Sequence, residues 1–427
     1  MTALRSLRSF ACGAVLFTAT TAGAQTPPSS QPRLQISALQ YSGAFRLPAA
    51  EFGSSSLNYS EGPFDYNAAN NSVFIVGHAH HQQIAEFRVP AIVNSTNLSS
   101  LNISGNPLQT FVNVIGKAPS GNPQDINRIG GMRLIPGANG PELVVNGYQY
   151  YDAAGTVSHT TLVVRSPGAL TTSTVGGFYS FAGGSGHTSG WISPIPAEWR
   201  TLLGGNYITG QSSGIPIISR TSVGPSAFAF NSSSLVGTSS VPNPIPTTKL
   251  LDFSLDNPLA SDLSNDTRTN NLWTHLSRVT YGFIAPGTRT YITIGTSGGH
   301  SSGVCYKCTQ DNGNVCGGFC SYVASDNHRF YWLWDVNDLV DVKEGRKTSH
   351  SVRPYAFGRF DGPFNSVTIG GASFDPASGR LYVALSAADN EQGTYSNPPV
   401  IAVYQVGAGS GGDNIPPAAP SILRVTN

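Results

Sequence analysis

Charged residues are scarce in this chain. Lys, Arg, Asp and Glu make up 11% of its 427 residues, against about a quarter of an ordinary soluble domain. The 24 basic and 23 acidic residues almost cancel, so the chain lacks the basic surface that binds nucleic-acid phosphates. We therefore expect no nucleic-acid partner, and we expect Ser, Thr, Asn and Gln to supply most of the polar surface.

Long apolar segments and long helical patterns are lacking as well. No stretch reaches the length that a membrane-spanning helix needs, so we expect no membrane span. The apolar residues fall in short runs rich in Val, Ile, Phe, Tyr and Thr, and clusters of Gly, Pro, Asn and Ser separate these runs. This pattern is typical of strands and turns. The sequence therefore predicts an all-β fold.

The first residues have the pattern of a secretory signal peptide. Arg5 and Arg8 precede a short apolar run, and the small residues Ala22, Gly23 and Ala24 follow it. Such a segment is removed on export. We therefore predict a signal peptide over residues 1–24, a flexible leader over 25–35, and a secreted protein, either extracellular or periplasmic.

Cysteine is sparse and clustered. Cys12 lies in the predicted signal peptide, and the other four cysteines lie between residues 305 and 320. Asn312 and Gly313 predict a two-residue hairpin turn between them, and an exported chain favours disulfides over free thiols. A four-thiolate zinc site is the alternative, but seven residues between the cysteine pairs are fewer than zinc ribbons use. The hairpin register predicts two nested disulfides, Cys305 with Cys320 and, after a bulge, Cys308 with Cys316.

A strand–turn–strand unit recurs along the chain. It is clearest at 371–384 and at 62–77, and weaker copies lie at 131–147, 204–210 and 279–295. The residues that close the second strand of each copy are Gly77, Gly147, Gly210, Gly295 and Ala384. Six equal intervals across this span would average about 51 residues, close to a kelch-type blade. Two further units are then expected near residues 253 and 340, which predicts a single seven-bladed β-propeller and leaves six or eight blades open.

The unit Phe374-Asp375-Pro376, followed by Gly379-Arg380-Leu381-Tyr382-Val383, resembles the blades of secreted bacterial β-propeller proteins. The resemblance covers residues 36–406, and in architecture it extends loosely to the propeller-fold ulvan lyases. It implies a central funnel in which His, Tyr and Arg act on a polysaccharide, although the catalytic motifs of those lyases do not align with this chain. We expect a strand within 36–45 to close the ring against 400–406, and residues 407–427 to form a Gly/Ser/Pro-rich linker tail.

The segments that follow equivalent strands of a propeller leave at the same face, which defines the candidate site. The predicted catalytic residues are His78, His80, Tyr148 and His300. The predicted substrate-binding residues are Tyr150, His187, Gln211, Arg128, Arg289 and Asp389. His187 and His300 lie in two similar segments, 186–190 and 299–303. The side chains of these predicted site residues suit hydrogen bonding and acid/base chemistry better than they suit an apolar pocket.

Three functions fit this pattern. The first is a polysaccharide lyase that acts on an extracellular glycan and needs no cofactor. The second is a non-catalytic propeller that binds carbohydrate or protein, and the third is a metal-dependent hydrolase or oxidase whose ligands converge from His78, His80, His187 and His300. Calcium as a structural ion stays open in the acidic segments 252–266 and 389–391, although neither has the spacing of a calcium loop.

Overall fold

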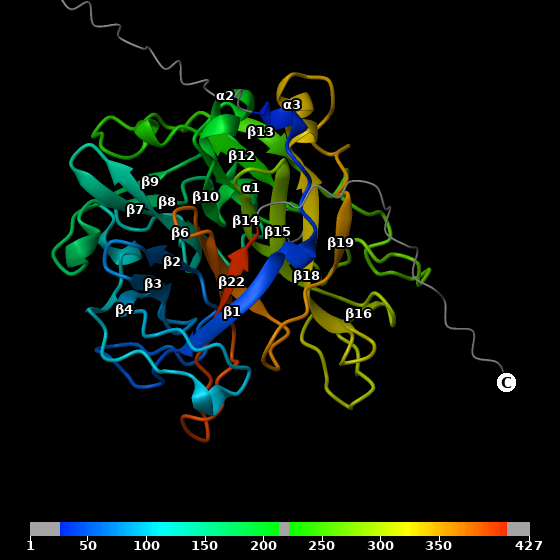
Figure 1. Ribbon diagram of the computed structural model, residues 1–427, viewed down its shortest axis with the longest axis horizontal. Helices are drawn as coiled ribbons and strands as arrows, with labels where there is room; N and C mark the ends of the chain where they lie inside the picture. Colours follow the sequence, from blue (N-terminus) through cyan, green and yellow to red (C-terminus); the bar gives the residue numbers. More distant parts are fainter. Residues whose placement is uncertain (1–25, 213–221, 408–427) are drawn as a thin grey trace, which may run out of the picture.

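The computed structural model describes residues 26–212 and 222–407. The predicted signal peptide and residues 408–427 of the predicted tail lie outside the described residues. The described chain folds into five four-stranded antiparallel sheets and one two-stranded hairpin. Figure 1 shows the sheets following one another around a ring in chain order, which is the arrangement of a β-propeller.

Each blade runs along the chain from its inner strand to its outer strand. The last blade differs only in its outer strand, which comes from the N-terminal part of the chain. Blade 1 contains β2 (Phe64–Asn67), β3 (Ser72–Val76), β4 (Ile84–Arg88) and β5 (Gln109–Val112). Blade 2 contains β6 (Arg128–Gly137), β7 (Gly140–Tyr148), β8 (Thr161–Val164) and β9 (Val175–Tyr179). Blade 3 contains β10 (Ile192–Pro194), β11 (Tyr207–Thr209), β12 (Ala227–Phe230) and β13 (Thr248–Leu251). Blade 4 contains β14 (Arg278–Ile284), β15 (Thr290–Gly298), β18 (Asn327–Asp335) and β19 (Ala356–Arg359). Blade 5 contains β20 (Ile369–Asp375), β21 (Arg380–Leu385), β22 (Val400–Val406) and β1 (Leu39–Arg46).

The ring is closed by the pairing of β1 with β22. The two strands are antiparallel, with Leu39 opposite Val406 and Arg46 opposite Val400, and Figure 1 shows blue β1 beside red β22. The inner strands β2, β6, β10, β14 and β20 contact one another in that order, and β20 contacts β2 again. The predicted closure of 36–45 on 400–406 is confirmed, and it joins the first described strand to the last within one blade.

The blade count is five, so the prediction of seven was wrong. The five sequence landmarks mark the second strands of the five blades, β3, β7, β11, β15 and β21. The two supposed further units are parts of blades already counted: 249–253 overlaps outer strand β13, and 330–334 lies in β18 of blade 4. Equal spacing failed because the connecting segments are long and uneven, and neighbouring landmarks lie 63 (147 to 210) to 89 (295 to 384) residues apart.

Paired glycines let neighbouring blades approach at the start of the inner strands. A Cβ on Gly130 would lie 2.1 Å from the carbonyl oxygen of Ser189, and one on Gly370 would lie 2.1 Å from that of Glu61. The strand register shifts at both positions, between Ile129 and Gly131 and between Ile369 and Gly371. These bulges therefore bring the backbones of adjacent blades closer together than any side chain permits.

Apolar side chains fill the spaces between the blades. All five Trp residues are fully buried, among them Trp191 and Trp332. Burial on both faces gives β3 and β21 nearly continuous apolar runs. The helices are short and lie outside the sheets. They are α1 (Ser185–Thr188), α2 (Arg200–Leu203) and α3 (Val336–Lys343), with 3-10 turns at Pro28–Ser30, Ile36–Ala38, Leu98–Ser100, Ile115–Lys117, Pro167–Ala169, Ala197–Trp199 and Ser232–Ser234.

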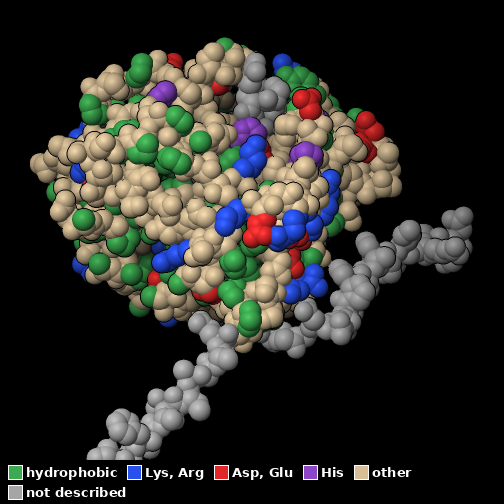
Figure 2. All heavy atoms as spheres, turned by 90° about the horizontal axis from the view of Figure 1, so that it is seen from above, with side chains coloured by type: hydrophobic (Ala, Val, Ile, Leu, Met, Phe, Trp, Pro, Cys, Tyr) green, Lys and Arg blue, Asp and Glu red, His purple; other side chains and the backbone are tan. Residues whose placement is uncertain are grey.

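The surface reflects the low charge of the sequence. In the face drawn in Figure 2, some of the Lys, Arg, Asp and Glu side chains form one group, others are scattered, and wide areas carry none. Within the described residues, no helix has the length and apolar character needed to cross a membrane.

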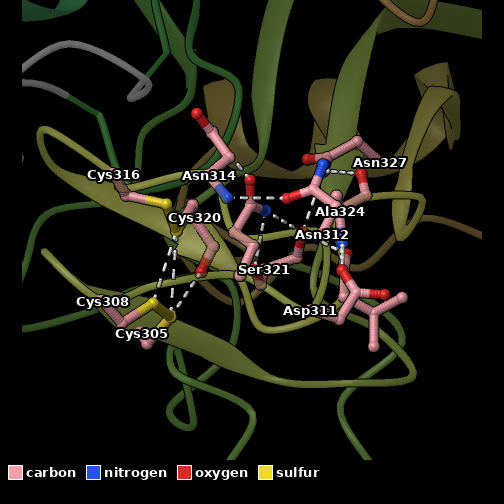
Figure 3. The surroundings of a disulfide bond; sticks show 12 residues. Cys305, Cys308, Asp311, Asn312, Asn314, Cys316, Cys320, Ser321, Ala324 and Asn327 are labelled. Atoms are coloured by element: carbon pink, nitrogen blue, oxygen red, sulfur yellow. Dashed lines mark hydrogen bonds between the residues drawn. A yellow bond between two sulfur atoms is a disulfide. The ribbon is translucent and has the colours of Figure 1, made fainter.

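The cysteine hairpin has the predicted register but not the predicted disulfides. Strands β16 (Val304–Tyr306) and β17 (Phe319–Ser321) place Cys305 opposite Cys320. The bonds nevertheless run along each arm, from Cys305 to Cys308 and from Cys316 to Cys320, so the nested pairing was wrong. Lys307 has a positive φ of 52°, and this left-handed turn brings Cys308 back toward Cys305. Figure 3 shows the four sulfur atoms in one cluster.

Candidate functional site

One end of the ring collects most of the candidate residues. The inner strands begin at this end, and the second strands finish there, because the two strands are antiparallel in every blade. The segments that carry His78, Tyr148, Gln211, His300 and Asp389 follow those second strands. The sequence-based expectation that they leave at one end is therefore met by the topology, and we call it the mouth end.

A cluster of charged and aromatic side chains surrounds the start of the inner strands. Arg128 and Arg278 are the first residues of β6 and β14, and Tyr148 ends β7 directly opposite Arg128. Arg128 Nε lies 3.7 Å from Glu61 Oε2, and its guanidinium group lies 4.9 Å from the ring centre of Tyr150. We call these five residues the mouth cluster.

Charged groups from three blades act on Tyr148. Burial raises the pKa of Tyr148, and the charges of Arg278, Glu61 and Arg128 act on it as well. These groups belong to blades 4, 1 and 2. A buried phenol with a raised pKa stays protonated at neutral pH and can donate a hydrogen bond or a proton.

His78 lies beside the mouth cluster. It bridges to Ser60, the residue before Glu61, and its ring packs against the rings of Tyr59, His80 and His81 at centroid distances of 5.5, 5.4 and 4.8 Å. Burial, together with His81 and His80, lowers the pKa of His78. It is therefore mostly neutral at pH 7 and can accept a proton.

His300 is held inside blade 4 rather than at the mouth cluster. Its Nε2 lies 2.7 Å from Ser297 Oγ and its Nδ1 lies 3.1 Å from the carbonyl oxygen of Asn270, while its ring stacks on Phe330. Burial lowers its pKa. Both ring nitrogens thus serve the packing of this blade.

A polar pocket of about 370 Å³ opens next to His300. Its lining includes Asp326, His328, Arg359, Ser301 and Ser302. One Asp326 oxygen accepts hydrogen bonds from the backbone N–H groups of Ser301 and Ser302, and the other lies 3.4 Å from His328 Nε2. Burial alone would raise the pKa of Asp326, but these hydrogen bonds outweigh it and lower the pKa.

His187 and Gln211 lie in blade 3, and neither contributes to the mouth cluster through a described contact. His187 Nδ1 lies 2.6 Å from Asp252 Oδ1, and Lys249 Nζ lies 2.7 Å from Asp252 Oδ2. Gln211 is buried, and its backbone N–H donates to Ser226 Oγ at 2.7 Å. The two residues stabilise connections within the blade.

Arg289 and Asp389 lie apart from the mouth cluster. Arg289 precedes β15, at the opposite end of β14 from Arg278, and its Nε lies 3.2 Å from Asp335 Oδ2. Asp389 is fully buried in a paired contact with Arg46, whose Nε and Nη2 each donate to it at 2.7 Å. Neither side chain has a described contact with the mouth cluster.

Asp65 is a structural residue of the inner strands. It accepts hydrogen bonds from Arg133 Nη1 at 2.9 Å, from the Leu134 N–H at 2.7 Å and from Ser373 Oγ at 2.6 Å. These partners come from β6 and β20, while Asp65 lies in β2. The carboxylate therefore ties three inner strands together.

The histidines do not converge on a metal site. Across 26–212 and 222–407, three or more His, Cys, Asp or Glu ligand atoms come together at Cys305, Cys308 and Cys320. The ligand set of the metal-dependent alternative, His78, His80, His187 and His300, is spread over blades 1, 3 and 4.

Arg278, Asp326, His328 and Arg359 were missed by sequence reasoning. For Arg278 a signal was present, because Arg278-Val279 stands at the same place in its blade as Arg128-Ile129. An alignment of the inner strands would have paired the two arginines. Asp326, His328 and Arg359 carry no such repeat signal, since they meet only through the fold of blade 4.

Comparisons with known proteins add little. No protein family and no curated protein match the chain. Among solved structures, the chain is similar to Sqt1 of Chaetomium thermophilum, with 11% identity and a TM-score of 0.28 over 86% of this chain and 72% of that one. A likeness this weak carries no argument, so the assignment of a β-propeller rests on the sheet topology.

Proposed function

We propose that the protein binds an acidic polysaccharide at the mouth cluster and cleaves it by β-elimination. The observation that carries the proposal is the buried Tyr148 opposite Arg128, with the charges of Arg128, Arg278 and Glu61 acting on it. A guanidinium group suits the carboxylate of a uronic acid, because it can bind both carboxylate oxygens. The predicted secretion of the protein favours an extracellular glycan as the ligand.

Elimination needs three functions, and the residues present can supply them. A base removes the proton on the carbon beside the carboxylate, a carbon–carbon double bond forms, and the bond to the neighbouring sugar oxygen breaks. Neutral His78 is the proposed base, and protonated Tyr148 is the proposed donor to the leaving oxygen. An arginine neutralises the substrate carboxylate, which stabilises the negative charge that develops in the transition state.

The test follows the ultraviolet absorbance of the unsaturated product on a panel of uronate-containing polysaccharides. We expect Tyr148→Phe to lower kcat by about 10²- to 10⁴-fold, the range for loss of a general acid. Arg278→Ala should lower kcat/KM, because the arginine binds the substrate carboxylate and stabilises the charge that develops on it. Tyr306→Phe, an exposed tyrosine of the cysteine hairpin, is the matched control and should keep full activity. No absorbance rise with the wild-type protein on any uronate polymer would refute the elimination.

Binding without cleavage is the second candidate, and the aromatic side chains at the mouth end favour it. Tyr59, Tyr150 and Tyr151 are exposed, and exposed tyrosines provide stacking surfaces for sugar rings. Retarded migration of the protein in a gel that contains an acidic polysaccharide, with no unsaturated product formed, would support this function. Tyr150→Ala should then weaken the retardation.

A further inference from the structure

We propose that the four cysteines of the hairpin 304–323, once reduced, form a tetrahedral thiolate site for a Zn²⁺ ion. This inference is independent of the glycan proposal, because the hairpin lies outside the mouth cluster. It rests on the positions of the sulfur atoms and on the way the arms of the hairpin are joined.

The sulfur atoms of the two arms already lie at distances from one another that suit zinc. Cys320 Sγ is 3.8 Å from Cys305 Sγ and 3.5 Å from Cys308 Sγ, and Cys316 is bonded to Cys320. A Zn–S bond of about 2.3 Å makes the edge of a thiolate tetrahedron about 3.8 Å long. Cys320 Sγ therefore stands close to a tetrahedral edge from both Cys305 Sγ and Cys308 Sγ. Within each disulfide the two sulfurs are bonded and must move apart on reduction; Figure 3 shows the two disulfides close together.

The short spacing between the cysteine pairs does not prevent this geometry. The segment between Cys308 and Cys316 folds back tightly, with the Gly313 N–H bonded to the Gln310 carbonyl and the Cys316 N–H bonded to the Cys308 carbonyl. The turn thereby brings the two cysteine pairs together over seven intervening residues. The fold therefore makes a four-sulfur site possible despite the short spacing between the cysteine pairs in the sequence.

The hairpin lacks a covalent link between its arms. Each disulfide closes within one arm, over sequence separations of 3 and 4. Strands β16 and β17 pair only with each other among the described strands, and Val315 and Tyr306 are 72% and 60% exposed. An isolated two-stranded hairpin is marginally stable. A metal ion bound by all four sulfurs would join the arms, which the disulfides do not.

Two equivalents of a dithiol reductant supply four electrons and four protons and are themselves oxidised to disulfides, while the two disulfides of the hairpin become four thiols. Zinc binds thiolates, so its binding releases protons from those thiols. Zn²⁺ suits the site because it favours sulfur ligands in tetrahedral geometry. The oxidised hairpin offers no thiolates, so the site depends on the redox state.

The experiment uses the whole chain, with Cys12→Ser throughout so that only the hairpin thiols are counted. The protein is reduced, dialysed against Zn²⁺ and then against metal-free buffer, and bound zinc is measured by mass spectrometry. We expect one zinc per reduced chain and none per oxidised chain. Co²⁺ in place of Zn²⁺ should give the visible absorption of a tetrahedral thiolate site. The variant Cys305→Ser with Cys308→Ser should lose both signals, and Thr309→Ser is the matched control.

A second measurement does not depend on the variant folding. Bound zinc should slow alkylation of all four thiols in the otherwise native hairpin, and removal of zinc by a chelator should restore it. Reduced protein that retains no zinc overturns the proposal, and so does equal zinc uptake by the double variant. Thiols that are alkylated equally fast with and without zinc overturn it as well.

Discussion

Loss of the Asp65 carboxylate should destabilise the whole ring. Asp65 is 1% exposed, and it holds Arg133, the Leu134 N–H and Ser373 with hydrogen bonds of 2.6 to 2.9 Å. In Asp65→Asn the amide cannot balance the Arg133 charge, and its NH₂ group would face donors. We therefore expect the substitution to act on three blades at once rather than on one strand.

The size of the effect follows from the burial of the pair. Removing one partner of a buried ion pair costs about 3–5 kcal/mol, because the remaining charge stays buried without compensation. That is a large share of the stability of an ordinary domain. Replacing both partners, as in Asp65→Asn with Arg133→Met, removes the uncompensated charge and should cost much less than the sum of the single changes.

Urea unfolding followed by tryptophan fluorescence measures these differences, since all five Trp residues are buried. Asp256→Asn makes the same chemical change on an exposed side chain and should change the free energy of unfolding by less than about 0.5 kcal/mol. The reasoning is refuted if Asp65→Asn costs under about 1 kcal/mol, or if the double variant loses as much as the two single variants together.

Three further predictions test the glycine contacts and two buried ionisable groups. Gly130→Ala should lower the free energy of unfolding by about 1–3 kcal/mol, because its Cβ would lie 2.1 Å from the Ser189 carbonyl oxygen; unchanged urea unfolding would contradict this. Burial lowers the pKa of His300, so its contribution to stability is complete above about pH 6.5 and is lost as the pH falls through the folded pKa. The melting temperature should drop between pH 7 and pH 5, and by less in His300→Gln; an equal drop in both proteins would argue against the assignment. Burial would raise the pKa of Asp389, but the hydrogen bonds from Arg46 outweigh it and lower the pKa, so Arg46→Gln should cost about 3–5 kcal/mol at pH 7. That cost should shrink below about pH 4, where the wild type loses the pair as well, and a cost that stays constant in acid unfolding curves would count against the ion pair.

Local sequence patterns were sufficient to predict the strands and the closure of the ring. Short apolar runs bounded by Gly, Pro and Asn predicted an all-β chain, and the pairing of 36–45 with 400–406 follows from the need to cover the edges of the first and last strands. The predicted register, Cys305 opposite Cys320, is likewise confirmed, although the tip is a three-residue loop, with the Gln310 N–H bonded to the Asn314 carbonyl, and not the predicted two-residue turn. In each case the deciding interaction is either local in sequence or required by any closed sheet.

Only part of the candidate site could be predicted from local sequence patterns. Tyr148, Tyr150 and Arg128 belong to one hairpin and its loop, so their proximity could be anticipated. Arg278 joins them from blade 4, and no local signal states which blades face each other across the axis. His300 looked equivalent to His187 because the flanking residues match, yet each ring meets a different partner, Ser297 in one case and Asp252 in the other.

By itself, the sequence determined the class of fold, the positions of the second strands and the register of the cysteine hairpin, because side-chain alternation and turn chemistry act over a few residues. Only the tertiary structure decided the number of blades, the pairing of the disulfides and the members of the mouth cluster. Each of these depends on distances through space between segments that long, uneven connections separate. The number of blades was therefore decided by how the sheets pack around the axis, not by the spacing of the repeats along the chain.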